Sequence, residues 1–323
     1  MNKNNKKLYI GAGLIVIACA IVGGYFFGTS HPATPVAVAP QSASSTLDPS
    51  NATYIIDGAP VTLIDGRSEQ AAAPGSAEKI TTQLFGAPVL GDVNGDGVND
   101  AAVILVQTGT GSGTFYYAAV ALATSTGSNS SGAGTVTVGT NAILLGDRIA
   151  PDTTQIANSI ITVNYADRKP TDPMSTPPSV GVSKYLVVAG AVLYDTPSDI
   201  HPLPSGITWN TAQAATVLPG DENVSAPLVG IKIVSQPITN ITDLATPSTP
   251  FENYYKAKLA AAGWTVDNAL AAGGPGADIV GYKKGNNYII LEYTSVFKNN
   301  GGGNSPETCP CDLTFSIFAG TEE

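Results

Sequence analysis

Short stretches of alternating apolar and polar residues, separated by Gly, Asn, Asp and Pro, make up most of the chain after residue 52. Alternation of this kind predicts strands, because successive strand side chains point to opposite faces of a sheet. The predicted strands of the first part are 54–56, 61–64, 80–85, 101–106, 115–123, 135–138, 142–145, 160–165, 185–188 and 192–194. Regularly spaced short strands with few helical stretches indicate a mainly β fold, an antiparallel sandwich or barrel.

The last hundred residues show a different pattern, with one helical segment between strands. Strands are predicted at 228–234, 279–283, 288–293 and 313–318. Thr249 to Glu252 has the spacing of a capping box with Pro250 at the first helical position, so a helix is expected to begin there. Gly263 is a natural end for it. This pattern predicts a small α+β domain.

Residues 8–27 contain no charged side chain and are long enough to span a membrane as one helix. Lys3, Lys6 and Lys7 precede the segment, which places the N-terminus in the cytoplasm and the rest of a single-pass protein outside. Two alternatives remain open: a cleaved signal peptide, and a lipoprotein in which Cys19 is lipidated.

Composition divides the 323 residues into five parts. Two shifts to Pro-rich and Ser-rich or Thr-rich sequence separate the folded regions, as is typical of spacers and linkers. The predicted parts are a cytoplasmic tail and transmembrane anchor at 1–28, a Pro/Ser/Ala-rich spacer at 29–51, a β-rich domain at 52–202, a linker at 203–223 and a small α+β domain at 224–320.

One loop carries candidate metal chemistry. The sequence from Gly91 to Asp100 places oxygen-bearing groups at alternate positions, followed at once by an apolar strand. Ca²⁺ takes six to eight oxygen ligands, and a glycine at the sixth loop position permits the sharp turn that such a shell needs. The predicted calcium ligands are Asp92, Asn94, Asp96, the carbonyl group of Val98, and Asp100. The alternative is a plain Asp/Asn/Gly turn.

The segment Phe85 to Asp100 resembles one FG-GAP repeat, the calcium-loop unit of integrin-type propellers, and less closely half of a dockerin. A propeller requires several such blades, and a dockerin requires a second copy with an acid where this chain has Val103. The resemblance therefore implies a metal loop, and only weakly integrin-like adhesion.

A longer part of the chain, 54–194, is similar to a family of exported, membrane-anchored bacterial proteins with one such loop. The stretches that carry this resemblance are 111–117, 141–151 and 163–168. The resemblance implies an envelope location and no assigned activity.

Charge and histidine content narrow the functional classes. Charged residues make up 12% of the chain and the net charge is −10, which argues against a nucleic-acid partner. The only histidines, His31 and His201, lie in proline-rich connectors, so a histidine-based triad or zinc site has little material.

Cys309 and Cys311 are separated by one proline. In an oxidising compartment we expect a disulfide clip before the last strand, and free thiols are the alternative.

The sequence predicts an extracytoplasmic binding or envelope-interaction protein with a structural calcium ion. Its partners would be the membrane, through residues 8–27, and an envelope glycan or protein. Tyr116, Tyr117 or Tyr165 could contact that partner, although core packing is the favoured role of these side chains. The alternative is a cell-envelope hydrolase that uses two carboxylates converging in a cleft.

Overall fold

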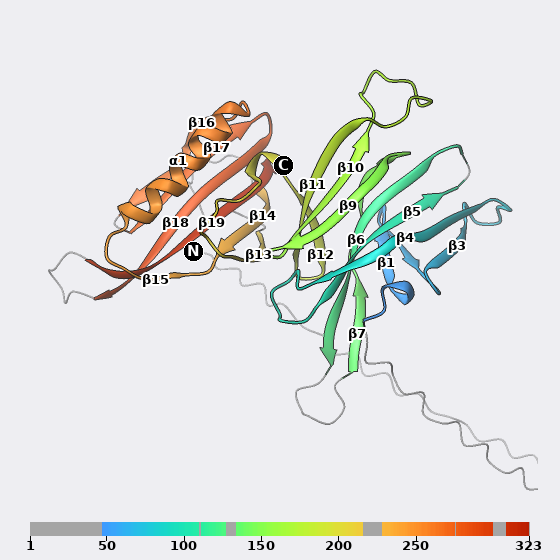
Figure 1. The fold of residues 1–323 in the computed structure, drawn as a ribbon, viewed down its shortest axis with the longest axis horizontal. Helices are drawn as coiled ribbons and strands as arrows, with labels where there is room; N and C mark the ends of the chain where they lie inside the picture. The colour runs from blue at the N-terminus through green and yellow to red at the C-terminus, as the bar shows by residue number, and fades with distance from the viewer. Residues whose placement is uncertain are drawn as a thin grey trace, which may run out of the picture. The chain divides into compact units, whose positions relative to one another are not determined.

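The computed structural model describes residues 47–109, 111–126, 134–215, 228–274, 276–299 and 308–322 (Figure 1). These residues are mainly β, with antiparallel sheets and the helix α1, so the mainly β, antiparallel prediction is confirmed. No helix within these ranges is long and apolar enough to span a membrane. The predicted anchor at residues 8–27 lies outside them.

The first described strands form the predicted hairpin. Strand β1 (Thr53–Ile56) pairs with β2 (Ala59–Thr62). The Asp57-Gly58 turn has positive φ at both residues, +50° and +80°, as the favoured two-residue hairpin turn requires. One face of the hairpin is buried, and Tyr54 is fully covered.

A six-stranded sheet has β5 near its centre. Every residue of β5 from Asp100 to Val106 is buried, because the two faces of the strand meet different layers. Ala101, Val103 and Leu105 contact the β1–β2 hairpin, and Ala102 and Ile104 face the next sheet. The sheet contains β3 (Arg67–Ala71), β4 (Lys79–Gly91), β5 (Asp100–Thr108), β6 (Thr114–Thr126), β7 (Gly134–Gly139) and β8 (Ile143–Asp147).

A four-stranded sheet covers the second face of this layer, giving a sandwich-like arrangement. Its strands are β9 (Ala150–Ala157), β10 (Ile160–Asp167), β11 (Val180–Ala189) and β12 (Val192–Thr196). Strand β11 is buried on both faces at its end: Leu186 and Val188 face the six-stranded sheet, whereas Val187 and Ala189 join a different core cluster with residues of the C-terminal part.

The C-terminal part is a seven-stranded sheet that carries α1 (Ala245–Ala261) on one face (Figure 1). Phe251, Tyr255 and Leu259 lie on one side of the helix and are buried against the sheet, where Phe251 stacks on Phe315 with ring centroids 4.4 Å apart. The strands are β13 (Trp209–Ala215), β14 (Leu228–Ser235), β15 (Ile238–Ile241), β16 (Thr265–Gly274), β17 (Ala277–Lys284), β18 (Asn287–Asn299) and β19 (Thr308–Glu322).

The start of α1 differs from the prediction. The helix begins at Ala245 and Pro250 lies inside it. Asp243 accepts hydrogen bonds from the Ala245 amide and the Thr246 hydroxyl, so the start is held by a residue upstream of the expected capping box. The predicted end is confirmed: Gly263 has φ +83°.

Five strands were not predicted: β3, β9, β13, β15 and β16. None of them has a clean apolar alternation, and β13 lies in the stretch expected to be a linker, 203–223. The proposed division into two domains at this stretch stays a prediction.

Candidate functional site

The loop at 92–100 is folded around its own side-chain oxygens. The Asp92 carboxylate accepts hydrogen bonds from the amides of Gly95 (2.7 Å) and Gly97 (2.9 Å). Asn94 Oδ1 accepts from the Asp96 amide at 3.0 Å. Asp96 Oδ1 accepts from the Val98 amide at 2.8 Å. Short Asp and Asn side chains that bind backbone two or more residues onward favour such turns, so the alternate spacing produces a tight loop.

Asp100 has a different role from the other predicted ligands. Its side chain is fully buried, with Oδ2 accepting from the Val93 amide at 3.1 Å and Oδ1 from the Ala123 amide at 2.9 Å. Burial raises the pKa of Asp100, as do the charges of Asp96 and Asp92, while the two amide hydrogen bonds lower it. Asp100 therefore connects the loop to β6.

The side chains of the other predicted ligands, Asp92, Asn94 and Asp96, are chemically suited to bind calcium. Asp92, Asn94 and Asp96 carry hard oxygen donors on one short loop, and Asn94 Nδ2 donates to Asp96 Oδ2 at 3.2 Å. The described residues contain no cluster of three or more His, Cys, Asp or Glu side chains that could hold a metal ion. A calcium ion in this loop stays a prediction, and so do Val98 and Asp100 as two of its ligands. Asp92, Asn94 and Asp96 are the residues whose side chains would hold the ion.

The loop lies where the two sheets of the first part meet. Val93 is fully buried in the core that they share. Ser159, in the turn between β9 and β10, donates to the Asp92 carbonyl group at 3.3 Å. A Cβ at Gly91 would lie 2.9 Å from Ile156 of β9, so the strand before the loop approaches the facing sheet closely. Stiffening of this loop would therefore also fix the contact between the six-stranded and four-stranded sheets.

A groove of about 410 Å³ lies on the six-stranded sheet. We call it the Phe85 groove. Phe85 is 42% exposed and meets Tyr116 edge to face, with ring centroids 5.4 Å apart. Of the three candidate tyrosines, Tyr117 and Tyr165 are buried in the core, the favoured role, and Tyr116 lines this groove. The lining residues are Arg67, Thr81, Gln83, Phe85, Val106, Thr108, Thr114 and Tyr116.

A larger cleft of about 630 Å³ lies between β11, β12 and the following turn on one side and the C-terminal sheet on the other. We call it the Lys/Asp cleft. Lys184 forms an ion pair with Asp195, and Lys284 Nζ lies 3.0 Å from Asp199 Oδ2. Trp264 Nε1 also donates to Asp199 at 2.8 Å. The hydrogen bonds from Trp264 and Lys284 lower the pKa of Asp199 despite partial burial, so this carboxylate is ionised at neutral pH.

His201, which the sequence placed in a proline-rich connector, is buried, and it contacts Thr196, a residue that lines this cleft. Its ring stacks on Tyr185 with centroids 4.1 Å apart. Thr196 Oγ1 donates its only proton to the Tyr185 carbonyl group, so His201 Nε2 must donate to Thr196 Oγ1, 2.8 Å away. Burial, and the nearby charge of Lys258, lower the pKa of His201 to about 3. The imidazole is therefore neutral and structural.

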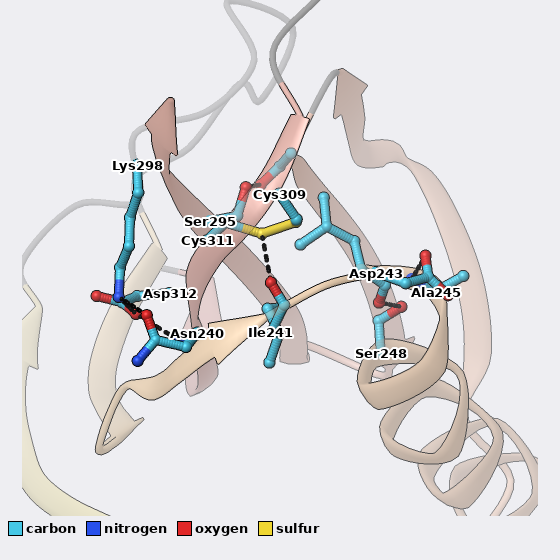
Figure 2. The surroundings of a disulfide bond; sticks show 12 residues. Asn240, Ile241, Asp243, Ala245, Ser248, Ser295, Lys298, Cys309, Cys311 and Asp312 are labelled. Atoms are coloured by element: carbon cyan, nitrogen blue, oxygen red, sulfur yellow. Dashed lines mark hydrogen bonds and ion pairs between the residues drawn. A yellow bond between two sulfur atoms is a disulfide. The ribbon is translucent and has the colours of Figure 1, made fainter. Parts of the chain in front are cut away.

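The expected disulfide between Cys309 and Cys311 is present. It lies within the last strand and not before it, because β19 begins at Thr308. Figure 2 shows Cys311 facing β15, with its Sγ 3.9 Å from the Ile241 carbonyl oxygen. Close by, Lys298 pairs with Asp312 at 2.8 Å. The disulfide fixes the start of β19 where β15 pairs with it.

No protein-family model, curated protein or solved structure matches this chain. The loop, the groove and the cleft are therefore the features that bear on function. The loop was predicted from the sequence, but both hollows were missed. The Phe85 groove depends on the pairing register of the successive strands β3 to β6, and the Lys/Asp cleft is lined by residues from strands far apart in the sequence.

Proposed function

We propose that this chain is a binding module held at the membrane by residues 8–27, with its folded part outside the cytoplasm, and that it binds an envelope glycan through the Phe85 groove. In this proposal the residues from 52 to 202 form a β-sandwich domain, those from 224 to 320 form a small α+β domain, and the loop at 92–100 holds a structural calcium ion. The observation that carries the proposal is the composition of the groove.

The groove presents aligned rows of side chains. Arg67, Gln83, Val106 and Tyr116 are direct neighbours on four adjacent strands. Directly opposed residues of an antiparallel sheet point to the same face, so they form one row. Thr81, Thr108 and Thr114 form the next row on three of these strands.

These rows suit a sugar chain. The C–H faces of a sugar ring pack on aromatic side chains, for which Phe85 and Tyr116 are available. Its hydroxyl groups exchange hydrogen bonds with amide, guanidinium and threonine groups, and a ligand site combines such polar groups with apolar surface. No acidic residue lines the groove among the described residues, which favours binding over glycoside hydrolysis there.

The Lys/Asp cleft does not favour the hydrolase alternative either. A carboxylate pair for hydrolysis needs one acid with a raised pKa beside an ionised one. In the cleft each of the two aspartates pairs with a lysine, and the pKa of Asp199 is lowered.

Binding to purified cell-envelope glycan tests this proposal. We expect the full chain, in mild detergent, to sediment with the insoluble glycan, and Phe85→Ser to weaken this binding about tenfold through the loss of ring contact. Leu90→Ser is the matched control, because Leu90 lies on the same strand, is 62% exposed and does not line the groove.

Equal binding by the wild type, Phe85→Ser and Leu90→Ser would contradict the groove as the glycan site. Retention of the wild type only by envelope preparations that still contain protein would indicate a protein partner and overturn the glycan proposal.

A further inference from the structure

The Lys/Asp cleft is lined by two lysine–aspartate pairs and by two glycines of the C-terminal sheet. Gly230 and Gly320 are paired neighbours on β14 and β19, and both line the cleft. A Cβ at Gly230 would lie 2.1 Å from the Ala319 carbonyl oxygen, so no larger residue fits this strand contact. The close contact between β14 and β19 beside the cleft therefore requires glycine at position 230.

One ion pair lies on the β11–β12 side of the cleft, and the other joins this side to the C-terminal sheet. Lys184 and Asp195 come from β11 and β12, whereas Lys284 lies at the end of β17 and Asp199 follows β12. The four side chains of these ion pairs are 25% to 45% exposed to solvent. Ion pairs of this kind contribute little stability by themselves, since water competes for both partners. A ligand group can therefore replace one partner at small cost.

We propose that the Lys/Asp cleft binds a small zwitterion, a ligand with one ammonium and one carboxylate group, such as a free α-amino acid or a short peptide with unblocked ends. The ligand carboxylate contacts a lysine of one pair, and its ammonium group contacts an aspartate of the other. Asn287, Ser183 and Ser198 also line the cleft and supply neutral hydrogen-bonding groups. A volume of about 630 Å³ lies within the usual range for small-molecule sites.

Charge balance selects this class over others. A ligand with two negative charges brings one of them against an aspartate, and a ligand with two positive charges meets a lysine in the same way. A neutral sugar leaves both ion pairs in place and gains only neutral hydrogen bonds. The inference is independent of glycan binding, because the Phe85 groove shares no residue with this cleft.

Calorimetry on the full chain in detergent tests the cleft with defined probes. Alanine and alanylalanine are the two zwitterions, and they distinguish an amino acid from a peptide as the source. N-acetyl-alanylalanine amide is the matched blocked ligand, and succinate is the dianion. We expect at least one zwitterion to bind, and the blocked ligand and succinate to bind at least about tenfold more weakly.

Two variants locate the binding. Lys284→Gln and Asp195→Asn each remove one charge from a different wall, and each is expected to weaken zwitterion binding about tenfold. Lys298→Gln is the control, because Lys298 forms a similar partly exposed ion pair outside the cleft. Melting curves confirm that each variant is folded.

Three results would overturn the proposal: no binding of either zwitterion by the wild type at up to about 10 mM, equal binding of the blocked dipeptide, or zwitterion binding that Lys284→Gln and Asp195→Asn leave unchanged. The comparison of free and blocked ligands uses the wild type alone, so it remains decisive even where a variant fails to fold.

Discussion

The loop at 92–100 and the connector around His201 each bury one ionisable side chain, and they accommodate it in different ways. Asp100 is surrounded by donors, with a backbone amide on each carboxylate oxygen. His201 is neutral, stacked on Tyr185 and bonded to the Thr196 hydroxyl. The carboxylate holds two segments together through its acceptors, whereas the imidazole fills space and must stay unprotonated.

This difference predicts different sensitivities. Removal of Asp100 leaves two buried amides without an acceptor, so the loop depends on the presence of the carboxylate. Removal of His201 affects packing, but protonation adds a charge where water is excluded and Lys258 is near. The first region responds most to mutation, and the second responds to pH.

The largest expected effect is that of Asp100→Ala. The Val93 and Ala123 amides lose their acceptors, and the free energy of unfolding should fall by about 3 kcal/mol. Denaturant unfolding in EDTA measures this loss. Asp96→Ala is the control: Asp96 is exposed, so without calcium the change should stay below about 1 kcal/mol. Equal losses in the two variants would contradict the bracing role of Asp100.

The next largest expected effect is a loss of stability at low pH, through His201. The pKa of His201 in the folded state, about 3, lies below its ordinary value of 6.5. The folded state therefore binds this proton less readily, and the stabilisation is present above pH 6.5 and is lost as the pH falls toward 3. Between pH 7 and pH 5, the titration of His201 should lower the free energy of unfolding by about 2 kcal/mol.

Unfolding of the wild type and His201→Gln at several pH values isolates this contribution from that of the carboxylates. Glutamine can still donate to Thr196 but does not titrate, so the difference between the two proteins should shrink as the pH falls. Parallel stability curves from pH 7 to pH 5 would show that His201 titrates normally in the folded protein.

The smallest expected effect is that of the disulfide. Cys309 and Cys311 close a very short loop, and the chain-entropy contribution of such a loop is at most about 1.5 kcal/mol. Cys309→Ser should lower the free energy of unfolding by about this amount, measured beside wild type under oxidising conditions. A loss above about 3 kcal/mol would show that the clip supports β15 and the start of α1 as well.

Local signals in the sequence were sufficient for part of this fold. Three features depend on neighbouring residues, and the structure has them as predicted: the Asp57-Gly58 hairpin, the apolar run 101–106 within β5, and the end of α1 at Gly263. Strand β9 was missed because most of its residues are polar or exposed. The start of α1 was misplaced because Asp243 competes successfully with the capping box downstream.

The buried residues of the site contact residues that are distant in the sequence, and these contacts were not predicted. The loop spacing identified oxygen-rich residues, but Asp100 is bonded to Ala123, 23 residues away, through the register of β5 and β6. His201 is buried by residues such as Tyr185 and Lys258 from other elements. No local pattern specifies such neighbours.

The central claim, that calcium completes the loop as a structural brace between the sheets, is tested most directly by melting the full chain with excess Ca²⁺ and with EDTA, beside Asp96→Ala. A ligand at about 100 times its Kd stabilises by about 2.7 kcal/mol, so Tm should rise by about 5 to 10 °C in the wild type and hardly at all in the variant. Identical melting of the wild type in Ca²⁺ and in EDTA would contradict the claim.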